Sequence, residues 1–323
     1  MARIRRSNPD APGIARQRRG RGFTYLDPSG ARLDDEATLT RIRALAIPPA
    51  WEDVWICPDP GGHLQATGTD AAGRRQYRYH DVWRERRDRA KFRRLQVFAA
   101  ALPDLRGQVS ADLRRRGFEQ PRVLAGTIRL LDRGALRIGS EEYQRRNGSH
   151  GLLTLQRTHM RISGDAVTLR FPGKSGVEQH VRVRDAALAR LLRGLRRAHD
   201  LAEVWAWHDG DTWRPLHGGE VNEYIREGLG GEASAKDFRT WHATVLAATT
   251  LAGHDPAEGK RAVASAMREV AAQLGNTPAV ARSSYVDPRV VDRFLDEGQT
   301  VEIGPDLSGT EVEAEVLRFI DSD

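Results

Sequence analysis

Cysteine is almost absent from this sequence, which has a single one, Cys57, among 323 residues. One cysteine can form neither an internal disulfide nor a cysteine-based zinc site, and its scarcity fits a reducing cytoplasmic compartment. No apolar run approaches the roughly 20 residues that span a membrane, so no membrane partner is expected. Residues 1–22 are basic but lack an apolar core, so they are not a secretory signal.

Lysine is the second scarce residue type. Only four of the 51 lysine and arginine residues are lysines, at positions 91, 174, 236 and 260. Arginine keeps its proton, whereas lysine can give one up, so Lys174 and Lys236 are candidates for proton transfer. The net charge is +7 and the pI is near 9.9. This balance favours an anionic partner, nucleic acid first, and a solvated basic surface is the alternative.

The length predicts about two domains of roughly 150 residues each. We expect a flexible basic arm over residues 1–21, a β-rich domain over 22–87 and a mostly helical domain over 88–323. The highly charged segment 84–94, RERRDRAKFRR, is the predicted link between the two domains. The last domain ends in an acidic segment after Pro288, with a final short helix at EVEAEVLRF.

The β-rich domain is predicted from short alternating segments that end at Gly and Pro turns. GFTYL, WEDVWICPD, HLQATGTD and RRQYRYH are the expected strands, with one helix at DDEATLTRIRALAI. In the last strand, aromatic residues alternate with basic ones, which suits a surface that faces a DNA groove. A half-buried strand with arginine on its wet side is the alternative. The candidate DNA-binding residues are Arg74, Arg75, Gln76, Tyr77 and Tyr79.

The second domain is predicted to be helical at 88–101, 108–116 and 121–134, followed by three strands. GLLTLQRTHMRIS, DAVTLRF and EQHVRVRD are these strands, and PGKSG turns the chain between the last two. Lys174 is therefore expected at the tip of a hairpin. Further helices begin near Ser234 and end at Gly275. The predicted fold class is α+β, a small β-rich domain plus a mostly helical domain with a small antiparallel sheet.

Five polar residues from four separate segments could together perform phosphodiester transesterification. That reaction needs a nucleophile in line, positive donors on the two non-bridging oxygens and an acid for the leaving oxygen. Tyr285, in LGNTPAVARSSYVDP, is the candidate nucleophile. Without a metal, guanidinium groups are the natural clamp for phosphate. The other candidates are Arg137, Lys174, Arg239 and Asn276.

Six motifs carry a resemblance to a known family. QATGTDAAGRRQYRYH, ALRIGSEEY, GLLTLQRTHM, FPGKSG, KDFRT and LGNTPAVARSSYVDP occur in this order. Together they resemble the type IB DNA topoisomerases, in particular the small poxvirus-like and bacterial ones, over residues 22 to about 290. The resemblance implies an isomerase that relaxes positive and negative supercoils by cutting one strand, letting it swivel and religating it.

The resemblance also implies a role for each candidate. Tyr285 would form a 3′-phosphotyrosyl intermediate, Arg137 and Arg239 would clamp the phosphate, and Lys174 would protonate the 5′ leaving oxygen with support from Lys236. Neither ATP, another cofactor nor a metal is expected. The expected protein is a bacterial, cytoplasmic, nucleoid-associated monomer that closes as a clamp around duplex DNA.

Asn276 departs from the family pattern, which usually has histidine at this position. Asparagine can donate a hydrogen bond to a phosphate oxygen, but it carries neither a proton nor a charge to transfer. The sequence therefore predicts reduced but real activity, with no imidazole limb in its pH profile.

Two other functions stay open at this stage. A tyrosine recombinase would share the chemistry, but usually has His-x-x-Arg where this chain has Lys236-x-x-Arg239, Gly-His in place of Gly275-Asn276, and a helical N-terminal half. A non-catalytic DNA-binding protein would need the basic surface but not the ordered catalytic set.

Overall fold

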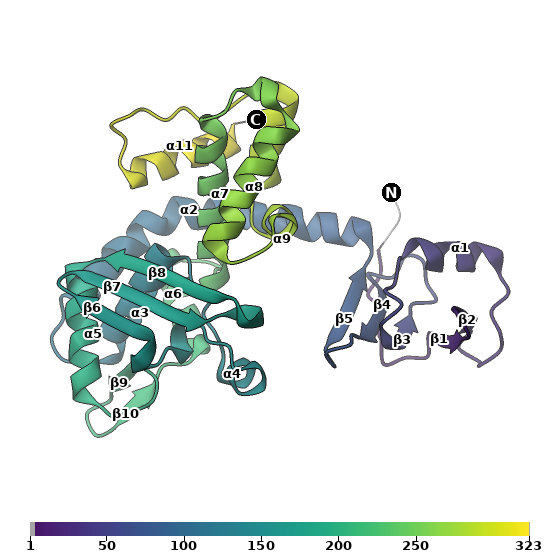
Figure 1. Ribbon diagram of the computed structural model, residues 1–323, viewed down its shortest axis with the longest axis horizontal. Helices are drawn as coiled ribbons and strands as arrows, with labels where there is room; N and C mark the ends of the chain where they lie inside the picture. The colour runs from purple at the N-terminus through teal and green to yellow at the C-terminus, as the bar shows by residue number, and fades with distance from the viewer. Residues whose placement is uncertain (1–3, 323) are drawn as a thin grey trace. The chain divides into compact units, whose positions relative to one another are not determined.

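The computed structural model describes residues 4–322, apart from the side chain of Tyr143, and forms two compact units, Met1–Lys91 and Phe92–Asp323. The boundary between them falls inside the long helix α2 (Asp81–Leu113), which is labelled in Figure 1. The predicted link at 84–94 is therefore helical. The predicted helices at 88–101 and 108–116 belong to the same continuous helix, which ends at Leu113. Apolar residues recur at helical spacing from the end of this charged stretch onward, where Phe92, Leu95 and Phe98 are buried, and the helix extends back from them to Asp81.

The first unit is an antiparallel sheet of five strands in the order β2-β1-β3-β4-β5, with one helix. A small core of Ile14, Ile42, Val54, Ile56 and Ala66 joins the sheet to that helix. These elements are β1 (Ile14–Arg19), β2 (Gly22–Leu26), α1 (Glu36–Ala44), β3 (Glu52–Ile56), β4 (Leu64–Thr69) and β5 (Arg75–Tyr79). The predicted β-rich fold of this part is confirmed.

The predicted flexible arm over residues 1–21 is wrong for its second half, because Ile14–Arg19 forms strand β1. Ile14 is buried and pairs with Ile56 of β3. The Arg16 guanidinium donates to the Trp51 carbonyl at 2.6 Å and lies 4.2 Å from the Phe23 ring centroid. One buried isoleucine and a tethered arginine thus order a segment whose composition is that of a solvated tail.

The second unit is mostly helical around one small antiparallel sheet, in the order β6-β7-β8. Helix α3 packs against this sheet at β8 (Figure 1). The remaining elements are α3 (Gln120–Gly134), α4 (Glu141–Asn147), β6 (Met160–Ser163), β7 (Ala166–Pro172), β8 (Glu178–Arg184), α5 (Ala186–Ala198), β9 (Ala206–His208), β10 (Trp213–Pro215), α6 (Gly218–Leu229), α7 (Ala235–Ala252), α8 (Lys260–Leu274), α9 (Pro278–Ser284), α10 (Pro288–Asp292) and α11 (Gly309–Asp321). The predicted α+β class is confirmed. No helix within residues 4–322 combines the length and apolarity needed to cross a membrane.

The predicted strand GLLTLQRTHMRIS is wrong over most of its length, since only Met160–Ser163 is extended. Residues 152–154 and 157–159 form single 3-10 turns instead. Leu152, Leu153 and Leu155 are all buried. A strand turns successive side chains to opposite faces and could not bury two adjacent leucines in a one-sided core, whereas a tight helical turn can.

Candidate active site

Tyr285 lies in the short link between two capped helices. The Thr277 side chain accepts a hydrogen bond from Val280 N at the start of α9, and the Asp287 carboxylate does the same for Arg289 N at the start of α10. Tyr285 itself follows the last residue of α9, and its N–H donates to the Ala281 carbonyl at 3.0 Å. Side-chain caps at both helix starts define where each helix begins, so the position of the half-buried tyrosine is set by the backbone.

Helix α7 contacts this link through Thr244, which is fully buried. The Thr244 hydroxyl accepts from Asp287 N at 3.1 Å and donates to the Thr240 carbonyl at 2.9 Å, and the Tyr285 carbonyl lies 3.4 Å away. The backbone next to Tyr285 is therefore tied to the helix that carries Arg239. Sequence reasoning missed Thr244, because a single threonine in the helical run ATVLAATT gives no signal of its own.

Arg239 is almost completely buried, at 4% exposure, and its charge faces Tyr285. Its guanidinium donates to the Leu274 carbonyl at 2.8 Å and to the Ala135 carbonyl, and its Cζ lies 5.4 Å from the Tyr285 ring centroid. Burial, with help from nearby Arg137, lowers the pKa of Arg239 to about 10, although Tyr285 acts in the opposite direction. Two backbone carbonyls thus fix a cation in place before any substrate binds.

Arg137 reaches the same point from the end of α3. Helix α3 ends at Ala135, which has a left-handed backbone with φ 47°. Arg137 then lies 3.4 Å from the Leu274 carbonyl through Nη1, and Nη2 donates to Asn276 Oδ1. The Asn276 Nδ2 group is buried and has no hydrogen-bond partner within the described residues. The Arg137 contact thus orients the asparagine, and its amide N–H groups remain available to a substrate oxygen.

Lys174 is exposed at the β7–β8 hairpin tip, as predicted. A cleft of about 530 Å³ brings it together with Arg137, Asn276 and Tyr285, and the apolar part of the lining includes Val177 and Val280. Four of the six predicted catalytic residues thus line the cleft. A fifth, Arg239, lies against the ring of Tyr285. Lys236 is exposed one turn before Arg239 on α7 and is not part of the cleft lining.

The electrostatic surroundings of Tyr285 favour its phenolate. Burial by itself raises the pKa of this phenol, but the positive charges of Arg239, Arg137 and Lys236 outweigh burial and lower its pKa below the usual value. Lys236 therefore acts on the tyrosine through its charge even though it lies outside the cleft. A tyrosine that ionises more easily is a better nucleophile at neutral pH.

The candidate DNA-binding residues lie on β5 in the first unit, and they divide into two groups. Gln76 Nε2 and Arg74 Nε both donate to Asp70 Oδ2, at 2.8 and 3.0 Å. These bonds, together with backbone donors, lower the pKa of Asp70 to about 2. Tyr77 and Tyr79 instead form an open stacked pair, with ring centroids 6.2 Å apart and Tyr77 half exposed. Arg75 is exposed on the same strand face as this pair.

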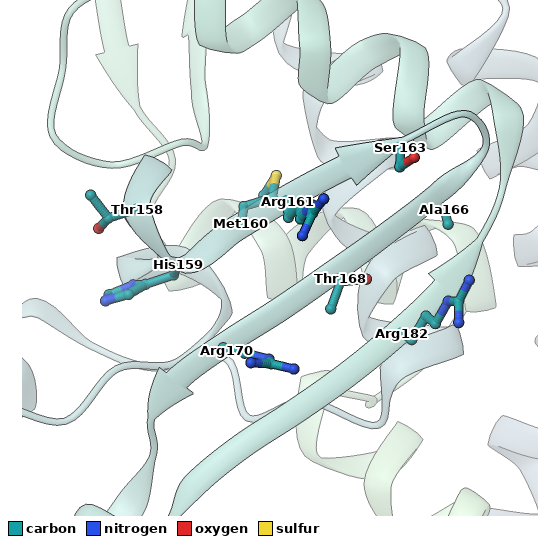
Figure 2. A pocket seen from close by; sticks show the side chains of 9 residues that line it. All are labelled: Thr158, His159, Met160, Arg161, Ser163, Ala166, Thr168, Arg170 and Arg182. Carbon is teal, nitrogen blue, oxygen red and sulfur yellow. The ribbon is translucent and has the colours of Figure 1, made fainter.

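A second cleft, of about 550 Å³, lies on the outer face of the β6–β8 sheet. Figure 2 shows Arg161, Thr168 and Arg182 side by side across the three strands, and the sheet register pairs them in this order. Arg170 lies further along the same face. None of the three arginines has an acidic partner in the described part of the chain. This face is strongly basic, and it contains none of the predicted catalytic residues.

Comparison with known proteins covers both units. Residues 80–302 match the family model of the eukaryotic DNA topoisomerase I catalytic core, and residues 22–70 match that of the bacterial DNA topoisomerase IB N-terminal domain. The chain is 31% identical over 285 residues to DNA topoisomerase 1B of Acanthamoeba polyphaga mimivirus, covering 85% of each protein. It is 22% identical over 291 residues to DNA topoisomerase 1B of vaccinia virus (strain Copenhagen), covering 86% of this chain and 88% of the relative.

Among solved structures, the XerH site-specific recombinase bound to its palindromic difH substrate matches 61% of this chain and 51% of its own, with a TM-score of 0.41 and 15% identity. The family models and the viral relatives, by contrast, extend over most of the sequence. They define an enzyme of the DNA topoisomerase I class. More narrowly, the chain belongs to the type IB DNA topoisomerases, and the resemblance seen in its motifs is confirmed.

Proposed function

We propose that this protein relaxes supercoiled duplex DNA through reversible attack of Tyr285 on a backbone phosphate. The observation that carries the proposal is the convergence of Arg137, Lys174 and Asn276 with Tyr285 around one cleft, with Arg239 beneath the tyrosine ring. Four separate chain segments supply these groups, and the α8–α9 turn supplies Asn276 and the carbonyl that both arginines share. Such an arrangement has the nucleophile, the clamp and the acid that transesterification requires.

In the cleavage step, Tyr285 Oη forms a bond to phosphorus while the bond from phosphorus to the 5′ oxygen breaks. The phenolic proton leaves to solvent, which the lowered pKa of Tyr285 assists. Lys174 gives a proton to the departing 5′ oxygen, so that a neutral hydroxyl is released. The 3′-phosphotyrosyl ester keeps one phosphoester bond for each one broken. Religation is therefore the same step in reverse and consumes no ATP.

The two arginines stabilise the charge that builds up on the non-bridging oxygens. Arg239 is fixed by two carbonyls, and its guanidinium lies against the Tyr285 ring. Arg137 and the free amide of Asn276 approach from the α8–α9 turn. Because these donors are held in position before substrate binds, little reorganisation is needed in the transition state.

The first unit contributes a further DNA-facing surface, formed by Arg75, Tyr77 and Tyr79. Open aromatic rings beside a cation suit contact with the edges and sugars of DNA. Swivelling about the uncut strand would remove supercoils of either sign. We expect a monomer that closes around duplex DNA and works in the bacterial cytoplasm on the nucleoid.

The direct test is relaxation of negatively and positively supercoiled plasmids in EDTA without ATP, with Tyr285→Phe beside the intact protein. We expect the intact protein to relax both and Tyr285→Phe to relax neither while still binding DNA. Denaturing the intact protein during reaction should trap it on the 3′ end of a nicked strand. Retained DNA binding without relaxation by the intact protein would overturn the proposal, and strand exchange confined to specific linear sites would indicate a recombinase.

A further inference from the structure

The side chain of Gln179, on β8, lies between two glycines from distant parts of the chain. A β-carbon on Gly173 would lie 2.6 Å from Gln179 Cγ, and one on Gly275 would lie 2.6 Å from Gln179 Nε2. Any other residue at either position would collide with this side chain. Gly173 directly precedes Lys174, and Gly275 directly precedes Asn276. Gln179 therefore fills the space between the two backbone segments that carry a proton donor and a phosphate contact.

The hairpin around Lys174 has few other restraints. Lys174, Ser175 and Gly176 are exposed, and Ser175 has a left-handed backbone with φ 63°, which is unfavourable for serine. Within the hairpin, Gly173 N donates to the Val177 carbonyl at 2.8 Å, and Gln179 Nε2 donates to the same carbonyl at 3.2 Å. The glutamine thus ties the base of the tip to its returning strand while its amide end reaches Gly275.

Strand geometry makes this contact specific to one face. Gln179 has the same orientation on β8 as Val181 and Val183, which face the helices, whereas His180 and Arg182 face outward. Gly275 ends α8 with φ 59°, a conformation that favours glycine, and the next residue is Asn276. The hairpin therefore contacts the α8–α9 turn from its inner face, on the side of the reactive cleft.

We propose that Gln179 is a positioning residue that holds the Lys174 hairpin against the α8–α9 turn, so that the ammonium group reaches the leaving 5′ oxygen. This inference rests on the proposed function. Gln179 does not touch the phosphate and transfers no proton. It acts by keeping Lys174 and Asn276 at a fixed separation, and small displacements of a catalytic group have large effects on rate.

A substrate with a sulfur leaving group distinguishes the positioning of Lys174 from a general loss of folding or DNA binding. A duplex with a 5′-bridging phosphorothiolate at the cleavage site expels a thiolate, which needs no proton, so a lost or misplaced acid is no longer limiting. Single-turnover cleavage of this duplex and of its oxygen counterpart is measured for Gln179→Ala. We expect the oxygen substrate to be cut about 10- to 100-fold more slowly, and the sulfur substrate within about twofold of the intact protein's rate.

Two further variants test the physical cause. Gln179→Met keeps the length of the side chain and should cut the oxygen substrate within about threefold of the normal rate, because volume-conserving changes retain packing. His180→Ala, at the neighbouring outward-facing position, is the matched control and should cut both substrates normally. If Gln179→Ala folds poorly, Gly173→Ala, at a position with φ −88° that other residues also adopt, should displace the glutamine from the hairpin side and give the same selective defect on oxygen.

Lys174→Ala in the same assay distinguishes this inference from the function on which it rests. Suppose that the sulfur substrate restores the cleavage rate of Lys174→Ala. If Gln179→Ala then cuts the oxygen substrate at the normal rate, or is slowed equally on both substrates, the positioning role is wrong and the proposed function stands. If sulfur does not restore Lys174→Ala, lysine is not the acid, and both the proton transfer and the role of Gln179 are overturned.

Discussion

The two ends of the Asn276 side-chain amide have different surroundings. Its Oδ1 accepts from Arg137, and its buried Nδ2 group has no partner among the described residues. An asparagine has the right donor for a phosphate oxygen but no titrating group, so its contribution does not vary with pH in the neutral range. The arginine contact also settles the orientation of the amide.

Substitution of Asn276 tests whether its Nδ2 group contacts the phosphate. Asn276→Ala should slow single-turnover cleavage about 100-fold, the usual effect of losing one oxyanion donor. Asn276→His should keep an N–H donor for the phosphate oxygen and add a change in cleavage rate near pH 6.5, the ordinary pKa of imidazole. The measurement is the cleavage rate between about pH 5 and 8. An Asn276→His rate equal to that of the unaltered protein at every pH would remove the phosphate contact from the mechanism.

The ionisation of Tyr285 should depend on the cations around it. Neighbouring cations lower its pKa despite burial, so the phenolate forms at a lower pH than in free tyrosine, near 10. Cleavage should therefore rise with pH and level off below that value. The six tyrosines can be labelled with ¹³C at Cζ and titrated by NMR, and Tyr285→Phe identifies the signal. Arg137→Gln should move its midpoint upward. A midpoint at or above 10 in the unaltered protein would contradict the charge argument.

At the scale of elements, α7 positions the nucleophile through Thr244. Thr244→Val keeps the shape of the side chain but leaves the buried Asp287 N–H without its partner, at a cost of about 1–3 kcal/mol. We expect a lower melting temperature and slower cleavage, because the link that carries Tyr285 loses its anchor. Thr244→Ser retains the hydroxyl and is the control. Equal stability and rate for the valine and serine variants would show that the hydroxyl does not hold the link.

The basic outer face of the β6–β8 sheet makes a separate prediction about DNA affinity. Arg161, Arg170 and Arg182 are changed together to glutamine. The slope of log affinity against log salt concentration should then become less negative by about 2 to 3, since each lost phosphate contact removes about 0.9. A matched triple variant of Arg32, Arg43 and Arg318 loses the same charge, but each of these is already paired with a carboxylate. Equal effects of the two variants would mean that only net charge matters.

The sequence predicts elements best where pattern and capping agree. Helix α8 and its end at Gly275, the Lys174 hairpin and strands β2 to β5 of the first unit are confirmed. Strand β1 was missed, because one buried isoleucine in an arginine-rich segment leaves no alternating pattern to read. The roles of Thr244 and Gln179 were also invisible, since both depend on contacts with residues 43 and 96 positions away in the chain. Motifs predict which groups react, whereas the residues that would position them can be found only from packing.

At the scale of the second unit as a whole, one arginine joins three helices. Arg106 of α2 forms two hydrogen bonds with Asp132 of α3, both at 2.8 Å, and two with Glu313 of α11, at 2.5 and 3.0 Å. His242 of α7 also faces Asp132, with Nε2 3.6 Å from Oδ1, and does not line the reactive cleft. Burial alone would raise the pKa of Asp132, but His242 and Arg106 lower it to about 2.

This network makes the stability of the second unit depend on pH in a defined direction. The folded pKa of Asp132 lies below its unfolded value of about 3.9, so the carboxylate stabilises the fold above that pH, and this contribution is lost as pH falls toward 2. Arg106→Met removes the main partner of a buried charge and should lower the free energy of unfolding by about 3–5 kcal/mol at neutral pH. Below about pH 4, where Asp132 of the variant becomes protonated, the deficit should narrow.

A second substitution separates the unpaired charge from the loss of packing. Arg106→Met combined with Asp132→Asn removes the buried charge of Asp132 as well and leaves only Glu313, whose side chain is 16% exposed, without its partner. This double variant should recover part of the lost stability at neutral pH, because replacing both partners costs less than removing one. Urea unfolding at pH 7 and pH 3.5 measures all three proteins. If the single and double variants are equally unstable at both values, the arginine stabilises α11 by filling space. If the deficit follows the charge of Asp132, an ion network joins the C-terminal helix to the helices that carry the reactive arginines.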